Sequence, residues 1–362
     1  MSYNFPQCVI SRSPSLSLRM NSARNRVFPI TRFLVASLLG MTLAFSASAC
    51  APAPSASTGK LNVVSTVAPV VNIIFNIAGD KVELTGIIPE GTDSHTFEPA
   101  PSDAIKLARA DLIFVNGLDL ETPTLKLAQA NKKTGAEIIA LGDLTLKPEQ
   151  YAFDFSFPKE KGHPNPHLWM DPFLTLRYAE IARDALARRD AAHAATYQAN
   201  YEKFRARITA LDAAIAQAVK TIPEKQRKLL TYHDSFAYFS KRYPLQVIGA
   251  IQPADFSDPL PRDVANLITQ IRAAGVPAIF GSEVFPSKVL EQIGREANVR
   301  YVDTLRDDAL PGKPGEKHHS YFGMMIENIK IIVNALGGDV ASLNAIEVTN
   351  IPGADAGVNY GR

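Results

Sequence analysis

The feature that most constrains the fold is a long helical segment, residues 173–219, that separates two runs of alternating strand and helix patterns. The first run predicts strands at 61–67, 82–88, 111–117 and 137–141, with one helix that opens at Pro69 and others at 101–110 and 121–131. The second predicts strands at 228–234, 245–251, 278–281 and 300–303, with helices at 263–274, 287–297 and 321–336. Such alternation is typical of parallel sheets covered by helices. We therefore predict an α/β fold with two Rossmann-like lobes.

The helical segment itself is expected to break near Arg189-Asp190, where Asp190 can cap the following helix. Apolar residues recur after the break at spacings of three and four, at Tyr197, Tyr201, Phe204, Ile208, Leu211 and Ile215. This spacing places one apolar stripe along a helix of about 40 Å, long enough to connect two lobes as a strut. The predicted domains are an N-terminal lobe at 60–190, a connecting helix at 191–220, a C-terminal lobe at 221–345 and a tail at 346–362. From Asp339 onward the chain is expected to be loosely ordered.

The first 49 residues are typical of an export signal. They contain five arginines and no acidic residue, and an apolar run at 33–45 follows that is too short to span a bilayer as a helix. The small residues before Cys50 resemble a bacterial lipobox, although Ala47 replaces the usual leucine. We therefore predict that Cys50 is the lipidated first residue of the mature protein; ordinary signal cleavage after Ala49 is the alternative. Residues 50–59, rich in Ala, Pro and Ser, then form a flexible tether.

Cysteine content and charge exclude several classes of protein. Only Cys8 and Cys50 are present, so the exported domain has no internal disulfide and no cysteine that binds metal. Without the five arginines of the signal, 33 basic and 36 acidic residues remain, giving a formal charge of −3. Nothing in this balance indicates a nucleic-acid partner.

The motif Pro164-Asn165-Pro166-His167-Leu168-Trp169-Met170-Asp171-Pro172 contains the only tryptophan of the chain. Pro166 has no backbone N–H and disfavours a helical conformation at Asn165, whereas Pro172 suits a first helical position. His167 is therefore expected in a stiff turn at a helix entrance, where it could act as a ligand. A buried turn histidine bonded to backbone is the alternative.

Three further side chains follow predicted strands. His95 comes after the strand at 82–88, His233 ends the strand at 228–234, and Asp308 follows the strand at 300–303. In open α/β sheets, ligands bind beyond the carboxyl ends of the strands. Two lobes facing each other across a cleft would bring these residues to His167. Three imidazoles and one carboxylate suit a borderline divalent ion, Zn²⁺ first.

Five motifs together, in this order and spacing, resemble the zinc/manganese solute-binding proteins of bacterial ABC importers across essentially the whole mature region. The motifs are Ser94-His95-Thr96-Phe97-Glu98-Pro99, Asn116-Gly117-Leu118-Asp119-Leu120-Glu121, Pro166–Pro172, His233-Asp234-Ser235-Phe236-Ala237-Tyr238-Phe239, and Asp308-Ala309-Leu310 before Tyr321-Phe322-Gly323. The resemblance implies a metal site in the interlobe cleft and a rigid connecting helix. It also carries ligand roles onto His95, His167, His233 and Asp308. In that family the third position is often histidine in zinc receptors and glutamate in manganese receptors, so His233 favours Zn²⁺ over Mn²⁺.

The sequence departs from the family pattern in two respects. Many zinc receptors carry a His- and acid-rich loop before the second ligand. In the corresponding residues 143–165, His163 is the only histidine. The fourth ligand is ambiguous by one residue because Asp307 adjoins Asp308, and the Asp-Ala-Leu register favours Asp308. The remaining histidines of the mature chain are expected outside the site; they are His163, His193, His318 and His319.

The expected function is that of a non-enzymatic, extracytoplasmic receptor that captures Zn²⁺ and delivers it to the membrane permease of an ABC importer. We expect a monomer that is either lipid-anchored at the cell membrane or periplasmic. A Mn²⁺ receptor is the first alternative, and an adhesin role remains open. A secreted zinc hydrolase is disfavoured, because four protein ligands would close the site and the sequence has no His-Glu-x-x-His motif.

Overall fold

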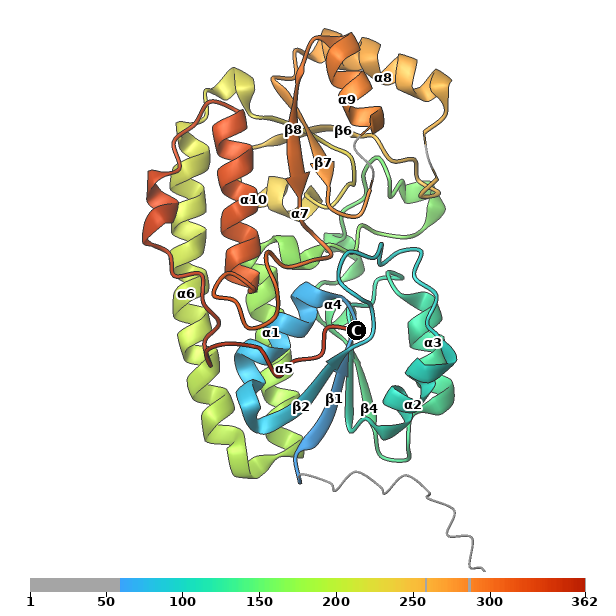
Figure 1. The fold of residues 1–362 in the computed structure, drawn as a ribbon, viewed down its shortest axis with the longest axis vertical. Coiled ribbons are helices and arrows are strands. Elements are labelled where there is room, and N and C mark those ends of the chain that lie inside the picture. Colours follow the sequence, from blue (N-terminus) through green and yellow to red (C-terminus); the bar gives the residue numbers. More distant parts are fainter. Residues whose placement is uncertain (1–58, 258, 286–287, 362) are drawn as a thin grey trace, which may run out of the picture. The chain divides into compact units, whose positions relative to one another are not determined.

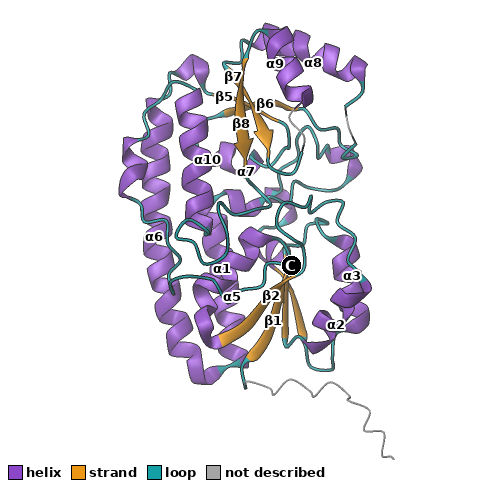
Figure 2. Cartoon of the chain, viewed as in Figure 1, coloured by secondary structure: helices purple, strands orange, loops and turns teal. Residues whose placement is uncertain are grey.

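The computed structural model describes residues 59–257, 259–285 and 288–361, all within the unit Ser57–Arg362. These residues contain two four-stranded parallel sheets, one in each lobe (Figures 1 and 2). The N-terminal sheet has the order β2-β1-β3-β4, from β1 (Leu61–Ser65), β2 (Val82–Gly86), β3 (Leu112–Val115) and β4 (Glu137–Ala140). The C-terminal sheet has the order β6-β5-β7-β8, from β5 (Lys228–Thr231), β6 (Gln246–Ala250), β7 (Ala278–Ser282) and β8 (Arg300–Leu305). The predicted α/β class with two lobes is confirmed.

Helices cover both sheets. In the N-terminal half they are α1 (Ala68–Ala78), α2 (Pro101–Arg109), α3 (Thr122–Asn131), α4 (Leu141–Thr145) and α5 (Pro172–Arg189). The later ones are α6 (Ala194–Thr221), α7 (Ala237–Arg242), α8 (Pro261–Ala274), α9 (Lys288–Ala297) and α10 (Tyr321–Ala335). Only the six-residue α7 and the five-residue α4 lack a counterpart among the helices predicted from sequence. None of the described helices is both long and apolar enough to cross a membrane.

Helix α6 is the long helix expected from the apolar stripe. Its 28 residues extend about 42 Å. The helix packs against α1, α5 and α10, and Figure 1 shows it alongside both lobes. The break before it falls where predicted, but Asp190 does not cap α6; it accepts hydrogen bonds from Tyr197 Oη at 2.6 Å and from His193 Nδ1 at 2.7 Å. These bonds hold a short turn in place of a continuous helix.

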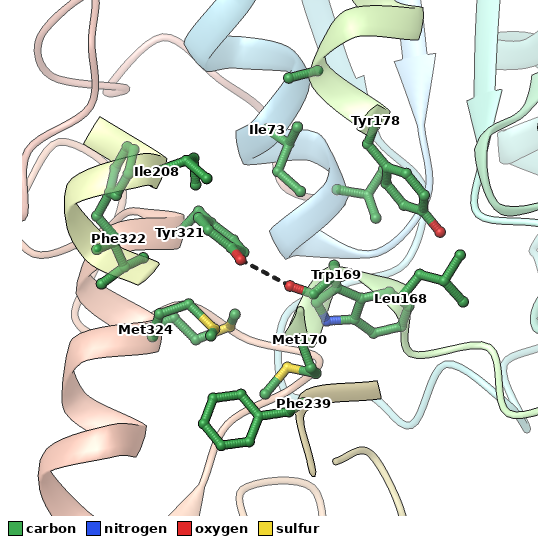
Figure 3. Close-up of a cluster of buried hydrophobic side chains, with 14 of the residues drawn as sticks. Ile73, Leu168, Trp169, Met170, Tyr178, Ile208, Phe239, Tyr321, Phe322 and Met324 are labelled. Atoms are coloured by element: carbon green, nitrogen blue, oxygen red, sulfur yellow. Dashed lines mark hydrogen bonds between the residues drawn. The ribbon is translucent and has the colours of Figure 1, made fainter. Parts of the chain in front are cut away.

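The largest apolar core is shared by the two lobes. It combines side chains from α1, α5, α6 and α10 with residues of both sheets, among them Leu112 in β3 and Phe280 in β7. Figure 3 shows its centre, where the Tyr321 hydroxyl donates to the Trp169 carbonyl oxygen at 2.9 Å. Two smaller clusters lie on the outer faces, beneath α2 and α3 and beneath α8 and α9. The motif around Trp169 is therefore part of the core that joins the lobes.

The tail corrects one sequence expectation. Residues beyond Asp339 were expected to be loosely ordered, but Asp355 and Tyr360 are buried. Asn359 pairs with Thr85 at the edge of β2, and Asn72 Nδ2 donates to Tyr360 Oη at 2.9 Å. The tail is ordered because it adds a backbone pair to an edge strand and buries an aromatic ring. The predicted signal at 1–49, the anchor at Cys50 and most of the tether lie outside the described residues.

Candidate metal centre

The three histidines singled out from the sequence come together. His95 lies in the loop after β2, His167 lies just before α5, and His233 follows β5. His167 Nε2 is 3.2 Å from His95 Nε2 and 2.9 Å from His233 Nε2. Among the described residues, these three form the one group of three or more His, Cys, Asp or Glu whose ligand atoms converge closely enough to hold a metal ion.

The turn that carries His167 is fixed by its own motif. Asn165 Oδ1 accepts the backbone N–H of His167 at 3.0 Å, and Asn165 Nδ2 donates to the Asp234 carbonyl oxygen at 2.6 Å. Helix α5 then begins at Pro172, with Asp171 Oδ1 accepting the N–H of Phe173 at 2.8 Å. A capping carboxylate satisfies an N–H group that a helix start otherwise leaves unpaired. The turn is therefore held both by the Asn165 amide and by the start of α5.

Two side-chain amides orient the imidazoles. His167 Nδ1 lies 2.8 Å from Asn165 Oδ1, and His233 Nδ1 lies 2.6 Å from Gln252 Oε1. An amide oxygen only accepts hydrogen bonds, so each Nδ1 carries the proton and each Nε2 keeps a free lone pair. Both lone pairs are then available at the point where the Nε2 atoms converge, which is the arrangement a metal-ligating histidine requires.

The two adjacent aspartates have different partners. The carboxylate of Asp308 is occupied by Ser94, whose N–H and Oγ donate to Oδ2 and Oδ1, both at 2.9 Å. Asp307 Oδ2 instead lies 3.4 Å from His233 Nε2 and 3.6 Å from His167 Nε2. In the described part of the chain this buried oxygen has no hydrogen-bond partner. Neighbouring side chains in this loop thus point in different directions, Asp307 toward His233 and Asp308 toward Ser94.

The donor atoms match the dimensions of a small cation site. Zinc–nitrogen bonds of 2.0–2.1 Å place two ligands of a tetrahedral ion about 3.3 Å apart. The separations from His167 Nε2 to the other two histidines and to Asp307 Oδ2 are 3.2, 2.9 and 3.6 Å. The separations measured from His167 are thus close to the spacing of ligands around a tetrahedral divalent ion.

Burial sets the protonation states of these groups. Desolvation, followed by repulsion from His233, holds the pKa of His95 and of His167 well below the ordinary value. These two imidazoles are therefore neutral at physiological pH, as metal binding requires. Desolvation also raises the pKa of Asp307 well above its usual range, and the charges of Glu283 and Asp93 raise it further. A cation bound beside this carboxyl would oppose the shift, because a nearby positive charge favours the ionised form.

Aromatic rings cover the side of the site formed by His95. The Phe256 ring stacks on the His95 imidazole at 4.5 Å between centroids and an interplanar angle of 17°. Phe157 lies 5.5 Å from the same imidazole, between ring centroids. A cavity of about 180 Å³ adjoins these residues, lined also by Leu118 and His163. The cavity therefore reaches the His95 imidazole directly, with the rings of Phe157 and Phe256 in its wall.

Three of the other four histidines of the mature chain, all but His318, have separate side-chain partners. His163 Nδ1 pairs with Asp119 at 2.8 Å on the surface, and His193 contacts Asp190 beside α6. His319 is buried against Asp355 and Glu90. Within the described residues the group that could hold a metal ion includes none of these four histidines.

Four residues that build the site were not identified from the sequence as part of it; they are Asn165, Gln252, Phe256 and Glu283. Asn165 stands in the His167 motif, and Gln252 and Glu283 each come just after a predicted strand. That position was the only available signal. Nothing in the residue types distinguishes them from ordinary loop residues.

Two lobes that both contribute to one buried cluster of metal-ligating side chains define a bilobal metal receptor. The family model described as zinc-uptake complex component A, periplasmic, matches residues 63–335. The chain belongs to this family, whose members are receptors of ABC importers and not enzymes. The suspected resemblance is confirmed.

Curated relatives carry different metals in their names. The metal ABC transporter substrate-binding lipoprotein FimA of Streptococcus parasanguinis is 31% identical over 83% of this chain and 98% of its own length. The manganese ABC transporter substrate-binding lipoprotein scaA of Streptococcus gordonii is 30% identical over 84% and 98%. The iron-binding protein YfeA of Yersinia pestis is 31% identical over 78% and 90%. Sequence similarity therefore identifies the chain as a metal receptor but does not identify its ion.

Solved structures agree with this class. The periplasmic zinc-binding protein TroA from Treponema pallidum has a TM-score of 0.70 and 28% identity, covering 77% of this chain and 99% of TroA. A manganese-bound periplasmic metal-binding protein from Candidatus Liberibacter asiaticus has a TM-score of 0.65 and 27% identity, covering 76% and 100%. The chain thus shares the bilobal fold of proteins whose names include both zinc and manganese.

Proposed function

We propose that this protein captures Zn²⁺ outside the cytoplasm and delivers it to the permease of an ABC importer. The observation that carries the proposal is the convergence of three imidazole Nε2 atoms with the orphaned Asp307 Oδ2. The proposed ligands are His95, His167, His233 and Asp307. A set of three nitrogens and one oxygen favours Zn²⁺, whereas Mn²⁺ favours oxygen-rich ligand sets.

We further propose that the receptor works as a monomer attached to the membrane through a lipid on Cys50. The Pro/Ala/Ser segment that follows Cys50 would then act as a tether between the membrane and the lobes. Helix α6 would keep the lobes at a fixed spacing while the loops of the site adjust to the ion. Mass spectrometry of the mature N-terminus tests the anchor, and a terminus without lipid would remove it from the proposal.

The metal assignment is tested by elemental analysis of protein purified without added metal, followed by competitive titration with Zn²⁺ and Mn²⁺. We expect bound zinc and a clear preference for Zn²⁺ at equal free concentrations. His167→Ala tests the site itself. It removes the imidazole whose Nε2 lies close to those of both other histidines, and it should abolish tight binding. A preference for Mn²⁺ would change the assigned ion but not the proposed role as a metal receptor. Binding that His167→Ala does not weaken would show that the metal binds elsewhere.

A further inference from the structure

Glu283 contacts the loop that carries Asp307. It directly follows β7, the strand next to β8, and Asp307 lies two residues beyond the end of β8. Glu283 Oε1 accepts three consecutive backbone N–H groups, from Asp307 at 2.9 Å, Asp308 at 2.9 Å and Ala309 at 3.0 Å. Successive N–H groups that converge on one anionic oxygen form a backbone nest. Here the anion is a side chain of the protein itself.

The nest determines where the two aspartate side chains point. With three N–H groups directed at one oxygen, the backbone of residues 307–309 is confined to one conformation. In that conformation Asp307 faces the histidines and Asp308 faces Ser94. The carbonyl oxygen of Asp307 is held from the other side by Trp169 Nε1 at 2.9 Å. The Asp307 residue is thus fixed at both its N–H and its C=O.

We propose that Glu283 is a positioning residue of the metal site, which acts through the backbone to orient Asp307 toward the ion. This inference rests on the proposed function. Hydrogen bonds to an ionised acceptor are about twice as strong as neutral ones, so a carboxylate holds the nest more firmly than an amide does. Without Glu283 the loop would lose three such bonds, and Asp307 would sample orientations in which it cannot reach the ion.

Zinc affinity of a small set of variants, measured by competition with a chelating dye, tests this role. Glu283→Ala should bind Zn²⁺ about 10–100-fold more weakly, the range for loss of a group that supports a ligand. Glu283→Gln keeps an acceptor oxygen at the same reach but loses the charge, so it should bind Zn²⁺ more weakly than the wild type and clearly more tightly than Glu283→Ala. Glu283→Asp keeps the charge but shortens the side chain by one methylene, so it should behave like the alanine variant.

A double-mutant cycle with Asp307 separates positioning from general support of the fold. In an Asp307→Ala background the further change Glu283→Ala should cost less than about threefold in affinity, because the carboxylate it positions is already gone. Glu316→Ala is the matched control. Glu316 is an exposed carboxylate of the same loop that accepts the Lys313 N–H at 3.2 Å, and its removal should leave affinity unchanged.

The outcomes are distinguishable from those of the metal assignment. If the wild type binds Zn²⁺ but Glu283→Ala binds it equally well, the positioning role is wrong while the receptor stands. Equal losses in the wild-type and Asp307→Ala backgrounds would also overturn it, because Glu283 would then act independently of that ligand. Should Glu283→Ala unfold, the contrast between the Gln and Asp variants decides: similar affinities for the two would contradict the proposal.

Discussion

The two lobes share one strand order but differ in regularity. In the N-terminal sheet β1 pairs with β2 and β3 in unbroken register. In the C-terminal sheet the register shifts between Leu229 and Leu230 and again between Phe280 and Gly281. Both shifts occur on strands whose carboxyl ends approach the metal centre. Irregular pairing is common beside functional sites, where it redirects the residues that follow.

The same difference extends to how each lobe holds its ligands. His167 is fixed by prolines, a capped helix and the shared core around Trp169. His233 and Asp307 are held instead by residues distant in sequence, His233 by Gln252 and the Asp307 backbone by Glu283 and Trp169. The comparison indicates that a local motif holds the ligand in the N-terminal lobe, whereas long-range contacts hold those of the C-terminal lobe.

The largest expected effect concerns the shared core. Phe204 in α6 is fully buried in the cluster that joins the lobes, whereas Ile293 in α9 is fully buried in the outer C-terminal cluster. Phe204→Ala should lower the free energy of unfolding by about 3–5 kcal/mol. Ile293→Ala should cost about 2–4 kcal/mol and leave the surroundings of Trp169 intact. Urea titration followed by the fluorescence of this single tryptophan checks both.

Lys203→Ala, on the exposed side of α6, is the control and should change stability by less than about 0.5 kcal/mol. If Ile293→Ala shifts the Trp169 transition as much as Phe204→Ala does, the two cores unfold as one unit. The contrast between a shared core and a separate outer cluster would then fail.

The next effect distinguishes the two aspartates. Asp307→Ala should weaken Zn²⁺ binding by about 100-fold or more, close to 3 kcal/mol, because it removes the only oxygen donor of the proposed set. Asp308→Ala removes the two bonds to Ser94 and should cost about tenfold, through looser placement of His95. Calorimetric titration of both variants checks the order. A larger loss for Asp308→Ala would restore the register inferred from the sequence.

This pair shows how far sequence reasoning reached. Strand and helix periodicity predicted both sheets, and the ends of β2, β5 and β8 indicated which loops would converge. The position of a residue along a strand does not determine the direction of a side chain in the following loop. Asp307 and Asp308 could be distinguished only once the contacts of Glu283 and Ser94 were known.

The tail was mispredicted for a related reason. Its local composition, with several Gly and Ala residues, contains little helix or strand pattern. Its order comes from distant partners, since Tyr360 and Asp355 bond to Asn72 and His319. Contacts between residues far apart in sequence are not visible in local patterning.

A smaller effect is expected from the junction of tail and lobes. Burial alone would lower the pKa of His319, but hydrogen bonds to Asp355 at 2.6 Å and Glu90 at 3.1 Å outweigh it and raise the pKa to about 9. The unfolded value is 6.5, so this stabilisation is complete below about pH 6.5 and is lost as the pH rises through 9. Unfolding free energies should fall by on the order of 2 kcal/mol over that window.

His319→Gln provides the matched comparison, since an amide can keep a hydrogen bond but cannot titrate. Its unfolding free energy should be lower at pH 6 and nearly flat from pH 6 to 10, as measured by urea titration at each pH. A wild-type profile that parallels the variant would show that His319 does not stay protonated in the folded protein. The tail would then not depend on this ion pair.

The smallest effect concerns the aromatic ring that the C-terminal lobe places against His95 of the N-terminal lobe. Phe256 has a positive φ of 59°, a region that costs a non-glycine residue about 1 kcal/mol or more, yet its ring stacks on His95. Removal of the ring in Phe256→Ala or Phe256→Gly should speed Zn²⁺ release several-fold, because water and chelator then reach His95. Glycine also relieves the backbone strain, so Phe256→Gly should unfold at a higher temperature than Phe256→Ala.

Stopped-flow chelator competition measures the release rate, and thermal unfolding measures the relief of strain. Leu260→Ala, which changes an exposed side chain of the same segment, is the control. Release rates equal to the wild type would mean that the ring does not limit access, and that the C-terminal lobe acts on the ion only through its ligands.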